Sequence, residues 1–269
     1  MTKRWLNRPM VKYGVRNALS GNVFKAFGAC LIPLVLTWVL RLLPNNLYMV
    51  YFEVVEGFHI GVSAFSLLLS FAVSIFAADP MAVRLAGYFL QLNRDSEALP
   101  SPLTVCECFD AEYGRLLRGM LLRRAYVALG TLAPLALGAL LPGALSFVEI
   151  ADMRVIRFSD AYRVCMLAAS AISVYLELSF AMVPYILSDQ PGLTADEALR
   201  ESRILMRDRK IEYLAMQLSF LGWLFFVSIS MFVAAVYALP YIEGTTAAYY
   251  IGFQDAIYGD GGSGDSAYR

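Results

Sequence analysis

Few residues of this chain have the chemistry and the spacing that an enzyme or a metal site requires. The single histidine is His59, and Cys106 and Cys108 form a lone C-x-C without a second ligand pair at zinc spacing. The chain contains no G-x-S-x-G, no H-E-x-x-H and no glycine-rich phosphate-loop motif. We therefore expect no catalytic residues, no metal site and no cofactor, and we expect that the protein is not an enzyme.

The carboxyl group of Glu177 is the first candidate for a binding site. It lies near the middle of a long apolar segment, where a lone carboxylate is costly unless it is protonated, paired or facing water. This position fits a proton or cation site. The alternatives are a neutral acid bonded to a neighbouring helix, or a group displaced towards the membrane interface.

A Pro-Tyr dipeptide occurs near the end of two apolar segments, as Pro184-Tyr185 and as Pro240-Tyr241. Such a repeat can mark related broken helices around a central site, as in transporters built from repeats, but kinks at helix ends explain it as well. Asp189 follows the first pair within a Ser-Asp-Gln-Pro-Gly turn. All of these residues are candidate binding residues.

The composition indicates which elements must position these residues. The chain is 59% hydrophobic and 16% charged, whereas soluble domains are about 45–50% apolar and about 25% charged. The apolar residues form long runs, and a run of about 20 residues crosses the membrane as a helix. The sequence therefore predicts an all-α, polytopic transmembrane helix bundle. With 22 basic and 22 acidic residues the net charge is zero, and we expect no nucleic-acid partner.

Four apolar runs are each long enough to form a membrane span, at about 23–43, 58–78, 125–141 and 164–187. A further apolar region, 211–253, fits two closely connected spans that turn near 228–230, or one span followed by an external amphipathic segment. We expect about six spans, with five as the alternative. They form a transmembrane bundle over 23–253, and a disordered tail follows at 254–269.

Two further segments have the periodicity of amphipathic helices. In residues 1–22, apolar and basic residues recur on separate faces, which predicts a helix lying in the membrane interface. Thr194 and Glu197 form a capping box that starts the second helix, on the surface or packed beneath the bundle. The basic residues that we expect at the membrane surface are Arg8, Lys12, Arg16, Arg200, Arg203 and Arg207.

The distribution of Lys and Arg predicts the orientation of the spans. The N-terminal segment and the loops 79–124 and 188–212 are rich in basic residues, whereas the first loop has only Arg41. Basic residues concentrate on the cytoplasmic side, so the N-terminus and these two loops are predicted to be cytoplasmic. The expected location is the cytoplasmic membrane, with membrane lipid as the immediate partner.

Five motifs spread over most of the chain are distinctive. They are A-L-S-G-N at 18–22, C-F-D-A-E-Y-G-R at 108–115, V-P-Y-I-L-S-D-Q-P-G-L-T-A-D-E-A-L-R-E-S at 183–202, L-S-F-L-G-W at 218–223 and L-P-Y-I-E-G-T-T-A-A-Y-Y at 239–250. Together they resemble a bacterial membrane protein family catalogued as domain of unknown function 975. The chain departs from the family pattern at 171–174 and 227–231, so it resembles a divergent member. The resemblance implies a bacterial membrane protein of about six spans, and it implies no activity.

Three functions fit these observations. The first is a non-enzymatic membrane protein that assists transport, envelope homeostasis or assembly of a membrane complex. It would bind another membrane protein or a second copy of itself. The second is a small transporter or channel whose pathway includes Glu177, and the third is an intramembrane enzyme acting on lipid.

Overall fold

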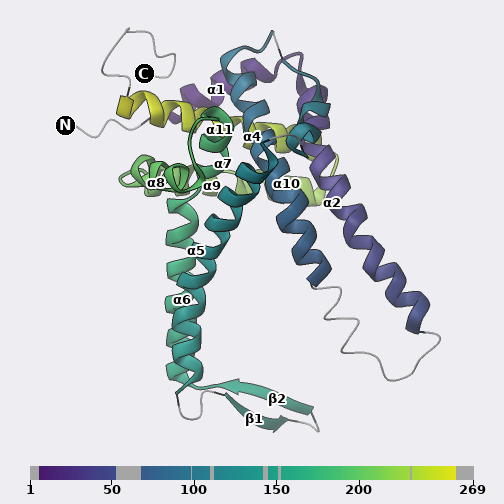
Figure 1. Ribbon diagram of the computed structural model, residues 1–269, viewed down its shortest axis with the longest axis vertical. Coiled ribbons are helices and arrows are strands. Elements are labelled where there is room, and N and C mark those ends of the chain that lie inside the picture. The colour runs from purple at the N-terminus through teal and green to yellow at the C-terminus, as the bar shows by residue number, and fades with distance from the viewer. Residues whose placement is uncertain are drawn as a thin grey trace.

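The molecule combines helices that run along its long axis with a layer of helices packed at one end (Figure 1). The computed structural model describes residues 6–52, 68–97, 99–109, 112–141, 145–150, 153–230 and 232–258. Its elements in chain order are α1 (Arg8–Leu19), α2 (Val23–Phe52), the π-helical turn η1 (Ser74–Ala78), α4 (Asp79–Arg94), the 3-10 segment η2 (Pro102–Phe109), α5 (Tyr113–Ala139), β1 (Leu145–Ile150), β2 (Met153–Phe158), α6 (Asp160–Ser179), α7 (Val183–Asp189), α8 (Ala195–Met206), α9 (Lys210–Leu218), α10 (Leu221–Ile229) and α11 (Ala235–Tyr258). We call α1, α7, α8 and α11 the end layer.

The predicted polytopic helical membrane fold is confirmed. Four helical segments are long and apolar enough to cross a membrane, namely Leu68–Arg94, Tyr113–Ala139, Asp160–Asp189 and Lys210–Ile229. A fifth is available if α1 and the first part of α2, which meet at 95°, form one span. The described residues therefore contain four candidate spans, or five with the bent pair, which matches the predicted alternative of five. They contain no sixth candidate span.

The segment that was expected to supply a sixth span is α11. The chain turns after Ile229, as predicted, but α11 is not among the apolar segments that qualify as spans. It runs across the direction of the α5–α6 pair (Figure 1), and its second half is largely buried within the protein, including Thr245, Thr246 and Tyr250. The length of an apolar run indicates that the segment lies in an apolar environment, but it does not distinguish lipid from the interior of the protein.

The predicted end of the second span at about residue 78 is wrong, because the helix continues through Asp79 and Pro80 as α4. In the π-helical turn before it, the Asp79 N–H donates to the carbonyl of Ser74. Pro80 has no N–H, so the carbonyl of Phe76, four residues earlier, lacks its usual helical donor. The Tyr113 hydroxyl donates to that carbonyl at 2.8 Å. A side chain of a neighbouring helix thus satisfies the carbonyl that proline leaves free.

Other boundaries also differ from the sequence prediction. The predicted loop 79–124 is largely helical, since it contains α4, η2 and the beginning of α5. Helix α11 ends at Tyr258, so the expected disordered tail, 254–269, begins within a helix, and residues 259–269 lie outside the described part. Strands β1 and β2 form an antiparallel hairpin, which was not predicted, at the far end of the α5–α6 pair (Figure 1).

Helix α1 lies within the segment 1–22 that was predicted to be an amphipathic helix, and it occupies Arg8–Leu19. It ends before Gly21, whose φ of +86° favours glycine and permits the bend towards α2. Its apolar residues Val11, Val15 and Leu19 are buried, and Val15 lies so close to α11 that a Cβ at Gly244 would be 3.0 Å from it. This apolar face of α1 is therefore packed against protein, and the placement of α1 in the membrane interface stays a prediction.

Helix α8 matches its prediction closely. Thr194 Oγ1 accepts from the Glu197 N–H at 3.4 Å, and the Glu197 carboxylate accepts from the Thr194 N–H at 2.8 Å, which confirms the capping box. The Thr194 hydroxyl also donates to the Glu197 carboxylate at 2.7 Å, and this bond, with that from the Thr194 N–H, lowers the pKa of the Glu197 carboxyl. The predicted apolar face is buried, and the exposed face contains Arg200, Arg203 and Arg207.

We expect both described ends of the chain to lie on the cytoplasmic side, because α1 and α11 lie together at one end of the molecule (Figure 1). In a chain whose four cysteines are replaced by Ala, Arg16→Cys and Ala256→Cys should react with a membrane-impermeant maleimide only after permeabilisation. Arg163→Cys, near the hairpin, should react in intact cells. Labelling of Ala256→Cys from outside, with Arg16→Cys protected, would contradict this orientation.

Candidate functional site

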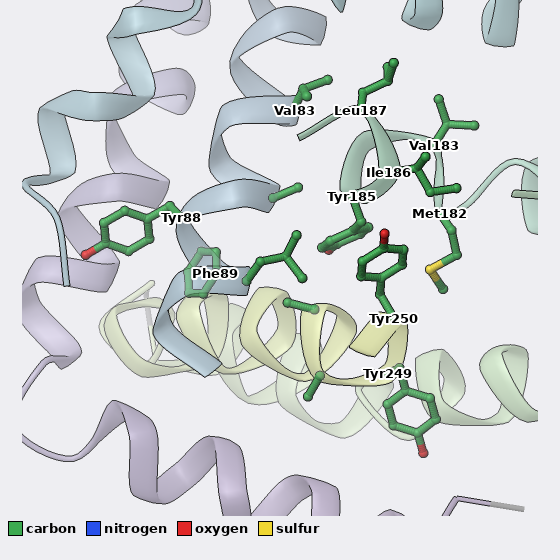
Figure 2. Close-up of a cluster of buried hydrophobic side chains, with 14 of the residues drawn as sticks. Val83, Tyr88, Phe89, Met182, Val183, Tyr185, Ile186, Leu187, Tyr249 and Tyr250 are labelled. Atoms are coloured by element: carbon green, nitrogen blue, oxygen red, sulfur yellow. The ribbon is translucent and has the colours of Figure 1, made fainter. Parts of the chain in front are cut away.

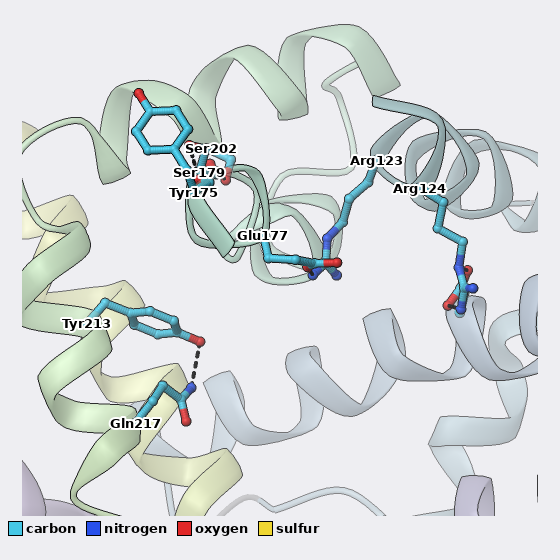
Figure 3. A network of polar contacts seen from close by, with 9 residues as sticks. Arg123, Arg124, Tyr175, Glu177, Ser179, Ser202, Tyr213 and Gln217 are labelled. Atoms are coloured by element: carbon cyan, nitrogen blue, oxygen red, sulfur yellow. Dashed lines mark hydrogen bonds and ion pairs between the residues drawn. The ribbon is translucent and has the colours of Figure 1, made fainter. Parts of the chain in front are cut away.

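The candidate carboxylate Glu177 lies near the C-terminal end of α6 and forms an ion pair with Arg123 of α5. The Arg123 Nη2 to Glu177 Oε2 distance is 2.6 Å (Figure 3). The Glu177 side chain is 51% exposed and that of Arg123 is 23% exposed. Glu177 is thus bonded to a neighbouring helix, as one of the alternatives proposed, but through an ion pair with arginine and not as a neutral acid.

The residue next to Arg123 makes a more buried contact with α4. Arg124 donates to both carboxylate oxygens of Asp79, at 2.5 and 2.7 Å, and to Ser74 Oγ at 2.8 Å. The Asp79 side chain is 8% exposed and that of Arg124 is 38% exposed. This bidentate pair joins α5 to the π-helical turn, and bidentate arginine–carboxylate pairs are among the stronger polar contacts in proteins. No local sequence pattern indicates this pair, because its partners are 45 residues apart.

Two of the predicted candidates lie at one junction of α4, α7 and α11. Figure 2 shows Tyr185 of α7 beside Tyr250 of α11, and Asp189 of α7 contacts Arg94 of α4 and Tyr250. The rings of Tyr185 and Tyr250 stack with centroids 5.7 Å apart and an interplanar angle of 25°. Asp189 accepts from Arg94 at 2.5 Å and from the Tyr250 hydroxyl at 3.1 Å. Burial and the nearby Asp189 raise the pKa of Tyr250 well above its ordinary value, so this hydroxyl remains a donor. The junction holds the end layer together.

The two Pro-Tyr pairs occupy different structural positions. Pro184 follows a break between α6 and α7 and lies in the first turn of α7, whereas Pro240 lies inside the continuous helix α11. Tyr241 packs against the rings of Trp223 and Tyr237, with centroids 5.8 and 5.7 Å away. The pairs are therefore not equivalent parts of two repeated broken helices.

A further carboxyl group, Glu243 of α11, was not among the predicted candidates. It is hydrogen-bonded to the Tyr185 hydroxyl, and burial raises its pKa above the ordinary 4.5 while that bond opposes the increase. Its signal in the sequence was that it is one of only two acidic residues in the apolar region 211–253. A partly buried carboxyl against a tyrosine hydroxyl is suited to a structural hydrogen bond.

The described residues contain no group of three or more His, Cys, Asp or Glu side chains that could hold a metal ion. Among the described residues, most of the arginines of α4 and α5 are paired with carboxylates. Arg115 also donates to a backbone carbonyl, that of Leu187. The charged groups that we have described therefore hold helices together. Arg200 and Arg203 of α8 and its C-cap residue Arg207 are exposed and form no salt bridge with a described carboxylate.

A family model described as "Protein of unknown function (DUF975)" matches residues 6–256 of this chain. The chain belongs to this family. No curated protein and no solved structure matches the chain. The resemblance noted from five sequence motifs is thus confirmed over nearly the whole DUF975 chain, and it assigns no activity.

The two neighbouring ion pairs of α5 should differ in their effect on stability. Arg124→Gln leaves the buried Asp79 carboxylate without its partner, which should cost about 2–3 kcal/mol. Arg123→Gln is its matched control, and it should cost less than about 1 kcal/mol because Glu177 is largely exposed. Thermal unfolding of the detergent-solubilised DUF975 chain measures the difference. Equal losses in the two variants would contradict the structural ranking.

The carboxyl of Glu243 should make the protein less stable as the pH rises. Because its folded pKa is above 4.5, the folded state holds this proton more tightly, so stability falls as the pH rises from about 4.5 through the folded pKa. Glu243→Gln should therefore melt at the same temperature as the wild type near pH 4 and at a higher temperature than the wild type at pH 8. Glu197→Gln is the opposite control, because its folded pKa is lowered and it should lower stability at pH 8. A lower melting temperature for Glu243→Gln at pH 8 would refute the prediction.

Proposed function

We propose that this protein is a non-enzymatic component of a membrane protein assembly in the bacterial cytoplasmic membrane, and that it binds another membrane protein through α5. The observation that supports this proposal is the exposure of α5. Only 6% of its most apolar 18-residue stretch is buried within the chain, against 33% for the span that contains α4.

One face of α5 is already occupied by α6. A Cβ added to Gly130 would lie 2.3 Å from Leu176 Cδ1, and one added to Gly138 would lie 2.8 Å from Cys165 Cβ. The two helices therefore approach closely through glycine, as helices in membranes commonly do. This contact leaves the other sides of α5 open.

One of the open sides is lined mainly by alanine. At spacings that place them on one helical face, the exposed residues are Ala125, Ala128, Leu132, Ala136 and Ala139. Lipid is as apolar as leucine, so small residues favour helix association in membranes by permitting close packing. The neighbouring exposed side has larger residues, among them Leu129 and Leu137, which are 67% and 65% exposed. The alanine face is therefore the better surface for a second helix, and lipid suits the larger side.

The other two functions receive less support. A transporter was expected to use Glu177, and that carboxylate is paired with Arg123. An intramembrane enzyme requires polar side chains that are available for chemistry, whereas the described carboxylates at the junctions are bonded to arginine or tyrosine. Assistance to a membrane complex is the role that fits both observations.

A photo-crosslinking amino acid at Leu132 should form protein adducts in native membranes, and one at Leu137 should form lipid adducts. Ala136→Ile should reduce the Leu132 adduct about tenfold, because a bulky group in a close contact costs about 1–3 kcal/mol. Ala133→Ile, the same change at an exposed alanine on the other side, is the matched control. The purified chain in nanodiscs tests a second copy as the partner. Lipid adducts alone at Leu132 would refute the proposal.

A further inference from the structure

The exposed face of α8 lies where the spans α5 and α6 meet the end layer. Ser202, on the buried face of α8, donates to the carbonyl of Ser179 at 3.0 Å. That carbonyl belongs to the last residue of α6, where the helix ends and the usual donor four residues later is lost. Figure 3 shows Ser202 and Ser179 together above the pair of Glu177 and Arg123. The bond fixes α8 at the depth at which α6 ends.

Three arginines project from the open side of α8. Arg200, Arg203 and Arg207 line a shallow open depression with Ile204, which is 44% exposed. Within the described residues, no carboxylate forms a salt bridge with these arginines, whereas Arg118 and Arg123 of α5 are both paired.

The nearby acidic groups already have partners. Asp196 accepts from Arg118, and Glu201 accepts from the Tyr258 hydroxyl. One exposed acid, Asp208, follows the helix. Glu201, whose partner is a neutral hydroxyl, and Asp208 keep their negative charge, so the exposed face presents three arginines without a salt bridge to a described carboxylate, and not a net positive helix.

Aromatic and apolar groups lie directly beside this charge. The Arg203 guanidinium is 5.6 Å from the ring centre of Phe180 and 6.0 Å from that of Tyr126. Lys210, just after α8, lies 3.7 Å from the ring centre of Tyr175. Tyr126 and Tyr175 are 45% and 58% exposed, and the amphipathic ring of an exposed tyrosine suits the headgroup level of a membrane.

The apolar surface continues from these tyrosines along both spans. One helical turn further into the span, Leu129 of α5 is 67% exposed. On α6, Val174 and Leu167 are 51% and 70% exposed. Basic groups, aromatic groups and an apolar wall thus follow one another in the order of phosphate, glycerol and acyl chain in a phospholipid.

We propose that this surface, formed by Arg200, Arg203, Arg207 and Lys210 with Tyr126 and Tyr175, binds the phosphate headgroup of an anionic phospholipid in the cytoplasmic leaflet. The arginines donate to the phosphate oxygens, as guanidinium groups do in bidentate geometry. The acyl chains lie along the exposed side of α5 and α6. Each basic side chain near an anionic membrane surface contributes about 1 kcal/mol, or about fivefold in affinity.

The full chain, purified in detergent, is mixed with equal amounts of phosphatidylglycerol and phosphatidylcholine, and native mass spectrometry measures the lipid retained. We expect a preference for phosphatidylglycerol that falls about 100-fold in the variant Arg200→Gln/Arg203→Gln/Arg207→Gln, from about fivefold per arginine. Arg8→Gln/Arg16→Gln/Arg163→Gln, with the same change of net charge at other surfaces, should keep the preference. Equal loss in both variants, or no loss in the first, would overturn the proposal.

Two further measurements test whether misfolding explains the loss of lipid and whether the site binds a soluble phosphate instead of a lipid. Arg200→Lys/Arg203→Lys/Arg207→Lys keeps the charges and should retain most of the preference, which weakens as salt is added. If inorganic phosphate at the lipid's concentration displaces phosphatidylglycerol, the site binds a soluble phosphate and the lipid assignment is wrong. Ala136→Ile, which tests the partner-binding role of α5, should leave the lipid preference unchanged, so the two proposals succeed or fail separately.

Discussion

Backbone carbonyl groups that lose their helical partners determine where the helices of this protein attach to one another. Three carbonyls at or near helix breaks or ends accept from side chains of distant segments. Phe76 accepts from Tyr113 at 2.8 Å, Ser179 from Ser202 at 3.0 Å, and Leu187 from Arg115 at 3.0 Å. An unpaired carbonyl in an apolar environment costs several kcal/mol, so each break requires such a donor. The breaks therefore allow the chain to change direction, and they also set the contacts of the end layer.

Helix α5 combines two different roles along its length. In its first half, arginines reach four other elements: Arg115 contacts α7, Arg118 contacts α8, Arg123 contacts α6 and Arg124 contacts α4. In its second half it contacts α6 through glycine, and its other sides are open. A helix that is held firmly at one end and exposed at the other is well placed to present a binding face within the membrane. The proposed partner site and the proposed lipid site both depend on this arrangement.

The two proposed sites lie on adjacent parts of the same structure and depend on different kinds of interaction. The alanine face of α5 depends on close packing within the membrane, where apolar burial provides no driving force between helices. The basic face of α8 depends on charge at the membrane surface, which salt weakens. Bound anionic lipid would fix the depth of α8 and, through the Ser202 bond to α6, the position of the α5–α6 pair. Together they describe a protein that organises its neighbours in the membrane.

The sequence by itself determined the features that depend on neighbouring residues. Long apolar runs determined the helical membrane fold, Thr194 and Glu197 determined the start of α8, and the periodicity after them determined which face of α8 is buried. The tertiary structure decided the features that depend on residues far apart in the chain. It placed α11 against protein where its apolar content also fitted lipid, and it kept Pro80 within a helix because Tyr113 satisfies the freed carbonyl. It also paired Glu177 with Arg123. Hydropathy and capping act within a few helical turns, whereas the partner of a buried polar group is selected by the packing of the whole chain.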